Sequence, residues 1–392
     1  MSQITHERTS TLKPGDLLAR AEKISGIISA EADSSESLGR MTDVAVAALM
    51  ESELPWALIP QEWGGLGGTD VLEIMDAIEE IAFADGSAGW VLMVHSFGGS
   101  ILASVLDPTT AESLFGVDTR GTVCGQAAPL GRAVRTEGGY RVTGRWQFGS
   151  GSNSATFVGG GCFVFDADGS MITENGEPVW IMPFMDLADV KQLGNWDVGG
   201  LRATASWDYS VNDLFVPDAM VVPLPTPALQ HNNTVLRLGF LSSVYAQHVS
   251  FTLGVLKRAF SEIVSIVADK TRVGYDGTVG ESPVFLYEFA QREAQYQAVR
   301  AYSRQVFAEA QDEPGGPTDL QQARIHVACA WMARESDDLI KWCHSWGGSA
   351  AVRTPNALTR CLNDIAVASN HLYVDRMNLV GPTPIILESW KS

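Results

Sequence analysis

The spacing of apolar residues changes twice along the chain, and these changes divide it into three parts. Before residue 120 the apolar positions recur at helical spacing and predict helices over Leu17–Ile28, Met41–Met50 and the run VLEIMDAIEEIAF. Asp70 precedes this run, and aspartate is a favoured residue at a helix N-cap. We therefore expect an N-terminal helical domain over residues 1–120.

Between Gly121 and Pro223, short runs rich in β-forming residues replace the helical pattern. These runs are GGYRVTGRWQF, ATFVGGGCFVF, PVWIMPF and TASWDYSV, and turn residues separate them at intervals of roughly ten residues. Such spacing is typical of a small sandwich or barrel. We expect a central β domain over residues 121–225.

From Thr234 onward the helical spacing returns. One apolar stripe of a long helix is formed by Leu241, Val244, His248, Phe251 and Val255. Further helices are predicted over residues 284–312, 318–345 and 355–374. The chain is thus expected to be an α+β protein in which a C-terminal four-helix bundle, residues 226–392, follows the β domain.

The charge balance excludes two classes of partner. The chain has 392 residues and a formal net charge of −19, whereas nucleic acids and anionic membrane surfaces attract basic proteins. No apolar run approaches the roughly 20 residues of a membrane span, and the first residues, MSQITHERTSTLKPGD, lack the apolar core of a signal peptide. The five cysteines are scattered without CxxC spacing, so no metal site is expected and the protein is predicted to be cytoplasmic and reduced.

The stretch GRWQFGSGSNSATFVGGG, residues 144–161, looks at first like a phosphate-binding glycine loop. It lies among predicted strands and not between a strand and a helix of a βαβ unit, which excludes a Rossmann or P-loop site. Its serines, Ser150 among them, are typical turn residues. The sequence alone does not explain the run Gly159–Gly161.

Two C-terminal segments carry candidate chemistry. In RCLNDIAVASNH, Arg360, Asp364 and His371 lie at i, i+4 and i+11 of the predicted helix and would share one face. This pattern fits an ordinary ion pair with a packed histidine. It also fits a His371 that acts as acid or base, because imidazole titrates near neutral pH. Gly347 and Gly348 in CHSWGGSAAVR fit either a helix C-cap or the close approach of backbone to a flat ligand.

Two further histidines lie on predicted helices. His248 belongs to the apolar stripe, and we interpret it as a core residue rather than a catalyst. His95, in GWVLMVHSFGG, lies where an N-terminal helix is expected to meet the β domain, so both a structural and a catalytic role remain open.

Several segments together resemble a known fold family. LIPQEWGGLGG, the helix–β–helix order, LFVP at the end of the β domain and the GG pair followed by RCLND are similar to the acyl-CoA dehydrogenase fold, over essentially the whole chain. GRWQFGSG, NWDVGGLRATASWDY and RCLNDIAVASNH resemble the oxygenase components of two-component flavin-dependent monooxygenases, among them 4-hydroxyphenylacetate, secosteroid-phenol, dibenzothiophene and indole oxygenases. The glutamate base of the dehydrogenases has no counterpart in NHLYVDRMNLVGPT or TVLRLGFLSSVYAQHVS, which disfavours the dehydrogenase reaction.

The resemblance implies a mechanism and its partners. A separate NADH- or NADPH-dependent reductase would supply reduced FAD or FMN, with FAD slightly favoured. Oxygen would convert this flavin to a C4a-hydroperoxyflavin, protected from water, that hydroxylates or epoxidises a small aromatic or heteroaromatic molecule such as a phenol or indole. A homotetramer, or at least a dimer, is expected because a second subunit often completes the cofactor site in this fold.

The resemblance also implies roles for individual residues. Ser150 would hydrogen-bond the reactive flavin edge, His371 would hold or transfer a proton, and His95 is the third catalytic candidate. Arg360 and Asp364 would be structural residues near the site. The residues implied to bind the cofactor are Gln126, Trp146, Phe148, Gly149, Ser150, Thr204, Ser206, Arg272, Trp346, Gly347 and Gly348.

Alternatives from two other classes remain open. An acyl-CoA dehydrogenase-type FAD desaturase with a displaced base would carry oxidised FAD that an acyl-CoA bleaches. A non-catalytic binding relative of the fold would bind no flavin. Oxygenation of an amine nitrogen is a further alternative within flavin chemistry.

Overall fold

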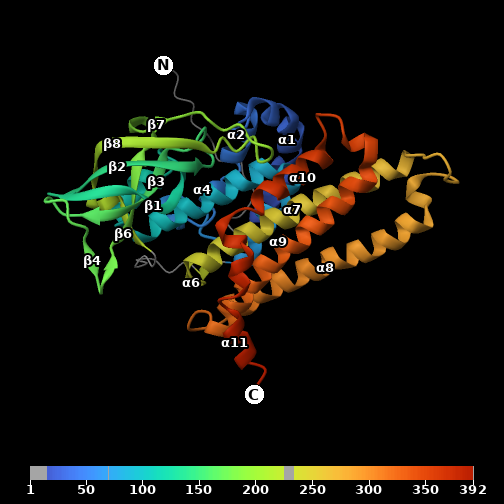
Figure 1. Ribbon diagram of the computed structural model, residues 1–392. Helices are drawn as coiled ribbons and strands as arrows, with labels where there is room; N and C mark the ends of the chain where they lie inside the picture. Colours follow the sequence, from blue (N-terminus) through green and yellow to red (C-terminus); the bar gives the residue numbers. More distant parts are fainter. Residues whose placement is uncertain (1–15, 69, 225–233, 392) are drawn as a thin grey trace.

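Helices from the two ends of the chain pack together, and the β-sheet lies to one side of them (Figure 1). The computed structural model describes residues 16–68, 70–224 and 234–391. The N-terminal helices are α1 (Leu17–Leu38), α2 (Asp43–Glu51), α3 (Val71–Ala84), α4 (Gly86–Val105) and α5 (Pro108–Phe115). As predicted, Asp70 caps α3, because its Oδ1 accepts a hydrogen bond from the Leu72 amide at 2.7 Å.

Seven strands form one mixed sheet. They are β1 (Val123–Thr136), β2 (Gly139–Gly149), β3 (Phe157–Phe165), β6 (Trp180–Asp186), β7 (Lys191–Gln192), β8 (Trp207–Pro217) and β9 (Val221–Leu224). Their order is β7-β8-β2-β1-β3-β6-β9, and only β1 and β3 are parallel neighbours. The strands β4 (Thr173–Glu174) and β5 (Glu177–Pro178) form a separate hairpin. The four β-rich runs of the sequence are β2, β3, β6 and β8, so the central β region is confirmed. Its strands form one seven-stranded mixed sheet, whereas their spacing had suggested a small sandwich or barrel.

The glycines of β3 make room for one tryptophan. Trp146 on β2 is fully buried, and its indole N–H donates to the Gly161 carbonyl at 2.8 Å. A Cβ on Gly160 would lie 2.6 Å from the Trp146 ring, and a Cβ on Gly161 would overlap the Ala127 carbonyl oxygen of β1. Close packing inside the sheet therefore explains the run Gly159–Gly161.

The C-terminal helices are α6 (Thr234–Arg237), α7 (Phe240–Asp269), α8 (Pro283–Gln311), α9 (Asp319–Gly347), α10 (Ala357–Ala368) and α11 (Thr383–Glu388). The helix predicted over residues 355–374 is shorter than expected. Asn356 caps its start, and it ends before Ser369 and Asn370, whose side chains compete with helical hydrogen bonds. His371 therefore lies in the following turn, and the prediction that it shares a helix face with Arg360 and Asp364 is wrong.

The first and last helical parts share one hydrophobic core. Buried side chains of α1, α3 and α4 pack in a continuous cluster with those of α7, α9 and α10. Among the described residues, one helix, α4, is apolar and long enough to cross a membrane, but 78% of its apolar window is buried inside the protein. An all-round apolar helix of this kind is typical of a protein core. Figure 1 shows α4 extending from the helical part to the sheet. The predicted domain boundaries at residues 120 and 225 stay predictions.

Candidate functional site

Three hydroxyl groups form a buried hydrogen-bonded chain, called here the hydroxyl chain (Ser150, Ser206 and Thr204). Ser150 follows β2, and the other two residues precede β8. Ser150 Oγ lies 2.7 Å from Ser206 Oγ, which lies 2.6 Å from Thr204 Oγ1. At one end, Trp90 Nε1 on α4 donates to Ser150 Oγ at 3.1 Å. At the other end, Thr204 Oγ1 donates to the Leu201 carbonyl at 2.8 Å.

The two ends of the hydroxyl chain determine the direction of its hydrogen bonds. An indole N–H can only donate and a carbonyl oxygen can only accept. Every contact is satisfied only if Ser150 donates to Ser206 and Ser206 donates to Thr204. Ser150 then uses its proton inside the chain and keeps one oxygen lone pair. A ligand beside Ser150 would therefore find a hydrogen-bond acceptor.

Backbone strain gathers around the hydroxyl chain. Phe148, Leu201 and Ala205 all have positive φ angles, of 61°, 52° and 46°. This conformation costs a residue with a Cβ on the order of 1–2 kcal/mol, and such residues cluster at functional sites. The Phe148 side chain is 54% exposed, and its ring centroid lies 6.2 Å from that of Trp196. The strained backbone thus presents an aromatic face beside Ser150.

Asp364 joins this region to the C-terminal helices. Its Oδ1 accepts the Leu201 amide at 2.5 Å, so α10 holds the residue whose carbonyl ends the hydroxyl chain. Burial, followed by the charge of Asp85, raises the pKa of Asp364 to about 8. Arg360, one turn earlier on α10, contacts two carboxylates of α1 at 2.8 and 2.9 Å. These two side chains link α1, α10 and the loop before β8.

His371 contacts a cluster of rings next to the hydroxyl chain, and we call this cluster the aromatic wall (Trp90, His248, Phe251 and Tyr373). Its ring centroid is 5.8 Å from Trp90, 5.4 Å from His248 and 4.9 Å from Tyr373. Trp90 therefore touches both His371 and Ser150. Burial lowers the pKa of His371 to about 4. The imidazole is neutral at pH 7, its Nδ1 accepts the Tyr373 amide at 3.4 Å, and its Nε2–H is left to donate.

Both ring nitrogens of His95 have partners within the protein. Nδ1 lies 2.9 Å from the Val123 carbonyl, and Nε2 lies 2.9 Å from Ser154 Oγ. Burial lowers the pKa of His95 to about 4. A Cβ on Gly151 would lie 2.8 Å from the imidazole, so a glycine is needed there. His95 thus joins α4 to the turn that carries Ser150.

The structure corrects the prediction that Trp146 flanks the cofactor. Its side chain is 0% exposed, stacks on Tyr209 with 5.5 Å between ring centroids, and lies across the glycines of β3. No face of the indole is left for a ligand. An aromatic residue beside glycines suits a buried core as well as a surface platform, so the sequence pattern did not separate the two.

Three other predicted cofactor residues lie near Ser150 and differ in how far they are exposed. Gln126 is half-buried on β1, and its Oε1 accepts the Gln147 amide at 3.3 Å. Phe148 is the exposed ring described above. Gly149 is buried, and a Cβ there would lie 2.8 Å from a serine oxygen of the same turn, so packing requires glycine. Gln126 and Phe148 are thus partly open to a ligand, and Ser150 is buried beside them.

The carboxyl end of α9 brings three predicted cofactor residues, Arg272, Trp346 and Gly348, together with Lys270, and we call this set the cation cluster. The Arg272 guanidinium lies 5.5 Å from the Trp346 ring, and Lys270 Nζ donates to the Trp346 carbonyl at 3.2 Å. Gly348 has a φ of 52°, and a Cβ there would lie 2.9 Å from Lys270 Nζ. Helix carboxyl ends favour cations, and both side chains suit a phosphate. Gly347, in contrast, is closed by apolar neighbours.

The cation cluster and His371 lie at opposite ends of α10. A Cβ on Gly347 would contact Leu358 at the start of this helix, whereas His371 follows its end. A helix of 12 residues is about 18 Å long. One mononucleotide would therefore not fill both places in one chain.

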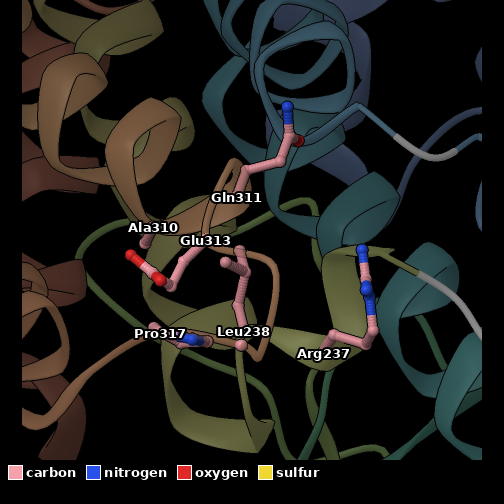
Figure 2. Close-up of a pocket in the computed structure, with 7 residues that line it drawn as sticks. Arg237, Leu238, Ala310, Gln311, Glu313 and Pro317 are labelled. Atoms are coloured by element: carbon pink, nitrogen blue, oxygen red, sulfur yellow. The ribbon is translucent and has the colours of Figure 1, made fainter.

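A small hollow at the end of α8 lies elsewhere and is no ligand site. Figure 2 shows Leu238 facing Ala310, Glu313 and Pro317 across it. Its interior has no space for a water molecule. The hollow contains no aromatic wall and no member of the hydroxyl chain.

A larger groove lies between α9 and the C-terminal segment. It has a volume of about 360 Å³ and is lined by residues that include His326 and Met377. The His326 ring lies 4.7 Å from Tyr245, and Tyr245 lies 6.0 Å from Tyr373, the neighbour of His371. A row of aromatic rings therefore leads from this groove to the wall around His371.

The residues at the hydroxyl chain fit the flavin that the sequence resemblance implies. Ser150 offers an acceptor, and Phe148 offers an exposed ring for the edge of a flat ligand. The cation cluster supplies charges that suit a phosphate.

Sequence reasoning missed Trp90 and Lys270, and it interpreted His248 as a core residue. A buried tryptophan N–H needs an acceptor, which was the available signal for Trp90. For His248 the signal was a polar residue on an otherwise apolar stripe.

Comparisons with known proteins agree with the family resemblance of the sequence. The family model described as acyl-CoA dehydrogenase, C-terminal domain, matches residues 246–376. A pigment production hydroxylase from Rhodococcus sp. is 26% identical over 381 residues, which cover 92% of this chain and 93% of that protein. The flavin-dependent monooxygenase, oxygenase subunit HsaA, of Rhodococcus jostii is 31% identical over 208 residues, or 51% of this chain and 52% of that protein.

A solved structure shows the same fold. XiaF from Streptomyces sp., in complex with FADH2 and glycerol, superposes with a TM-score of 0.84 at 21% identity and covers 96% of this chain and 95% of its own. The expected order of a helical part, a central sheet and a second helical part is confirmed.

Proposed function

Because the chain belongs to the flavin-dependent monooxygenases of the acyl-CoA dehydrogenase fold, we propose that the hydroxyl chain and His371 form the site that oxygenates a small aromatic or heteroaromatic molecule. The observation that carries this proposal is the direction of the hydroxyl chain, which leaves Ser150 as an acceptor. N5–H of a reduced flavin is a donor, whereas N5 of an oxidised flavin is an acceptor. The site therefore favours the reduced cofactor that a separate reductase supplies.

The relatives confirm a monooxygenase over the alternatives. A desaturase needs a carboxylate base, and one place for it is the start of α7. In the structure this helix has no acidic residue before Glu262, and His248 is the residue that faces Trp90 and His371.

Individual residues of this chain would hold the reactants and exclude water. When bound, the reduced flavin supplies the two electrons that let O2 give one oxygen atom to the substrate and the other to water. Ser150 would accept N5–H, and Phe148 and Gln126 would flank the cofactor edge. The buried indole of Trp90 closes this side against solvent. His371, which is neutral at pH 7, would exchange a proton with the substrate.

His95 would act as a positioning residue in this scheme. It holds the turn that carries Ser150, and its two nitrogens are already bonded to Val123 and Ser154. Arg360 and Asp364 would likewise position the loop before β8.

The cation cluster favours FAD over FMN. Lys270 and Arg272 would meet phosphate groups, and their distance from His371 suits the longer dinucleotide or a cofactor shared with a second subunit.

Apolar residues on α8 support association into a dimer or homotetramer, since Val284, Leu286 and Tyr287 are 56%, 54% and 67% exposed. We place the enzyme in the cytoplasm, with a reductase that uses NADH or NADPH as its partner.

The decisive experiment follows the oxidation of reduced FAD by O2 in a stopped-flow spectrophotometer. We expect the protein to change the rate of flavin oxidation and to retain the flavin at micromolar concentration. With ¹⁸O2 and a panel of phenols and indoles, one ¹⁸O atom should enter the product. Oxidation at the rate of free flavin, with no binding of reduced FAD or FMN, would overturn the proposal.

A further inference from the structure

His248 has a buried imidazole whose two nitrogens lack partners. It lies in the middle of α7 and is 1% exposed. Neither Nδ1 nor Nε2 has a hydrogen-bond partner within the described part of the chain. A buried polar group left in this state costs about 1–3 kcal/mol, and an apolar residue of the same size would avoid this cost.

The groups around His248 come from three separate elements. Trp90 on α4 lies 5.3 Å away, His371 in the turn after α10 lies 5.4 Å away, and Phe251 on α7 lies 6.2 Å away, all measured between ring centroids. None of these rings makes a hydrogen bond to the imidazole of His248. The imidazole is therefore aimed at the same aromatic wall that His371 touches.

This part of the wall carries no charge at neutral pH. Burial and the neighbouring His371 lower the pKa of His248 to about 3. The pKa of His371 is lowered to about 4 by its own burial. The Nδ1 of His371 accepts the Tyr373 amide at 3.4 Å and leaves Nε2–H as a donor, whereas neutral His248 offers one N–H donor and one bare nitrogen acceptor. Such a pair suits a neutral hydroxyl or ring N–H and provides no cation for a carboxylate.

We propose that His248 and His371 together bind the hydroxyl or ring N–H of an uncharged aromatic substrate, with His248 as the deeper partner. This inference rests on the proposed oxygenase function and adds the substrate class, a phenol or an indole without a carboxylate at this end. His371 is half-buried and forms the entry side, whereas Trp90 and Phe251 would contact the apolar ring. The polar group of the substrate would supply the partner that His248 lacks.

The test compares ligands that differ only in the polar hydrogen. Binding of phenol and toluene, and of indole and naphthalene, is measured by calorimetry to the full chain without flavin. We expect the wild type to prefer phenol over toluene. His248→Leu should reduce this preference about tenfold, which is the effect of losing one hydrogen bond. His248→Gln should restore part of it, because an amide also donates and accepts.

A matched control separates this role from packing. Leu253 is equally buried on α7 but does not belong to the wall around His371. Leu253→Val should weaken all ligands alike and keep the phenol preference. In ¹⁵N-histidine spectra, phenol should move the ring nitrogens of His248 and His371 and leave those of His95 in place, because His95 is already bonded.

The outcomes distinguish this inference from the proposed function. If His248→Leu keeps the phenol preference, or the wild type shows none, His248 does not bind substrate and the inference is overturned. The stopped-flow behaviour of reduced FAD with the wild type reports on the oxygenase function independently of either result.

Discussion

The backbone amide of Leu201 donates to the Asp364 carboxylate at 2.5 Å, across 163 residues of sequence. Through this bond α10 holds the loop in which Thr204 and Ser206 continue the hydroxyl chain. The same helix ends three residues before His371, so one element positions both parts of the site. Asp364 is thus a structural residue on which the geometry around Ser150 depends.

Asp364→Ala should lower the free energy of unfolding by about 1–3 kcal/mol, because the buried Leu201 amide loses its acceptor. The loop before β8 should loosen as well, and the affinity for reduced FAD should fall. Urea unfolding and an anaerobic flavin titration would measure the two effects. A variant that unfolds earlier but binds reduced FAD as tightly as the wild type would show that Asp364 supports the fold only.

Asp364→Asn should change the pH dependence of stability. The raised pKa, about 8, means that the folded protein holds this proton more tightly than the unfolded chain. The stability that it contributes is full below about pH 4 and is lost as the pH rises through 8. Asparagine keeps the acceptor for Leu201 without titrating, so the variant should gain stability relative to the wild type as the pH rises from about 4 to about 8. Parallel pH profiles would contradict the assignment.

Buried histidines should make the protein unstable in acid. Burial lowers the pKa of His95 and His371 to about 4 and that of His248 to about 3. The unfolded chain takes up these protons near pH 6.5, so stability is full above that pH and falls as the pH drops toward 4. His248→Leu removes one of the three histidines that take up a proton on unfolding. The slope of the unfolding free energy against pH should decrease by up to about 1.4 kcal/mol per pH unit between pH 4 and 6.

At neutral pH, His248→Leu should unfold no earlier than the wild type, because it removes two unpaired buried nitrogens. Thermal unfolding of both proteins at pH 5 and pH 8 provides the comparison. A marked loss of stability at pH 8 would indicate that His248 has a structural partner.

Ser206→Ala should reverse the hydrogen-bond role of Ser150. Without Ser206 the Ser150 hydroxyl can donate its proton to a ligand. The preference of the site for reduced FAD over oxidised FAD should therefore weaken. A tenfold loss of preference corresponds to a midpoint potential of bound FAD that is about 30 mV lower. Ser170→Ala, at an exposed serine of the same β region, is the matched control and should leave the potential unchanged.

Gly160→Ala should strain the sheet, because the new Cβ would lie 2.6 Å from the Trp146 ring. Overpacking of this kind costs about 1–3 kcal/mol. A Cβ on Gly199 would meet no heavy atom of the described residues within 4 Å, so Gly199→Ala should leave the urea midpoint unchanged. Equal midpoints for the two variants would refute the packing explanation of the β3 glycines.

The sequence by itself determined the order of the elements and the residues that bear the chemistry. Helical spacing placed the long helices, Asp70 marked the start of α3, and the β-rich runs became strands, because these preferences act between residues close in the chain. The motifs around Ser150 and His371 indicated the same family as the names of the similar proteins.

Only the tertiary structure decided which side chains are free and which are occupied. Trp146 lies in the core, and His371 leaves its helix to meet Trp90. The hydroxyl chain meets Trp90, which lies 60 positions before Ser150, and Asp364 reaches Leu201 across 163. Burial and hydrogen-bond partners depend on such distant segments. A local pattern therefore identified His248 only as one member of an apolar stripe, whereas the packed fold showed it as a buried imidazole without a partner among the described residues.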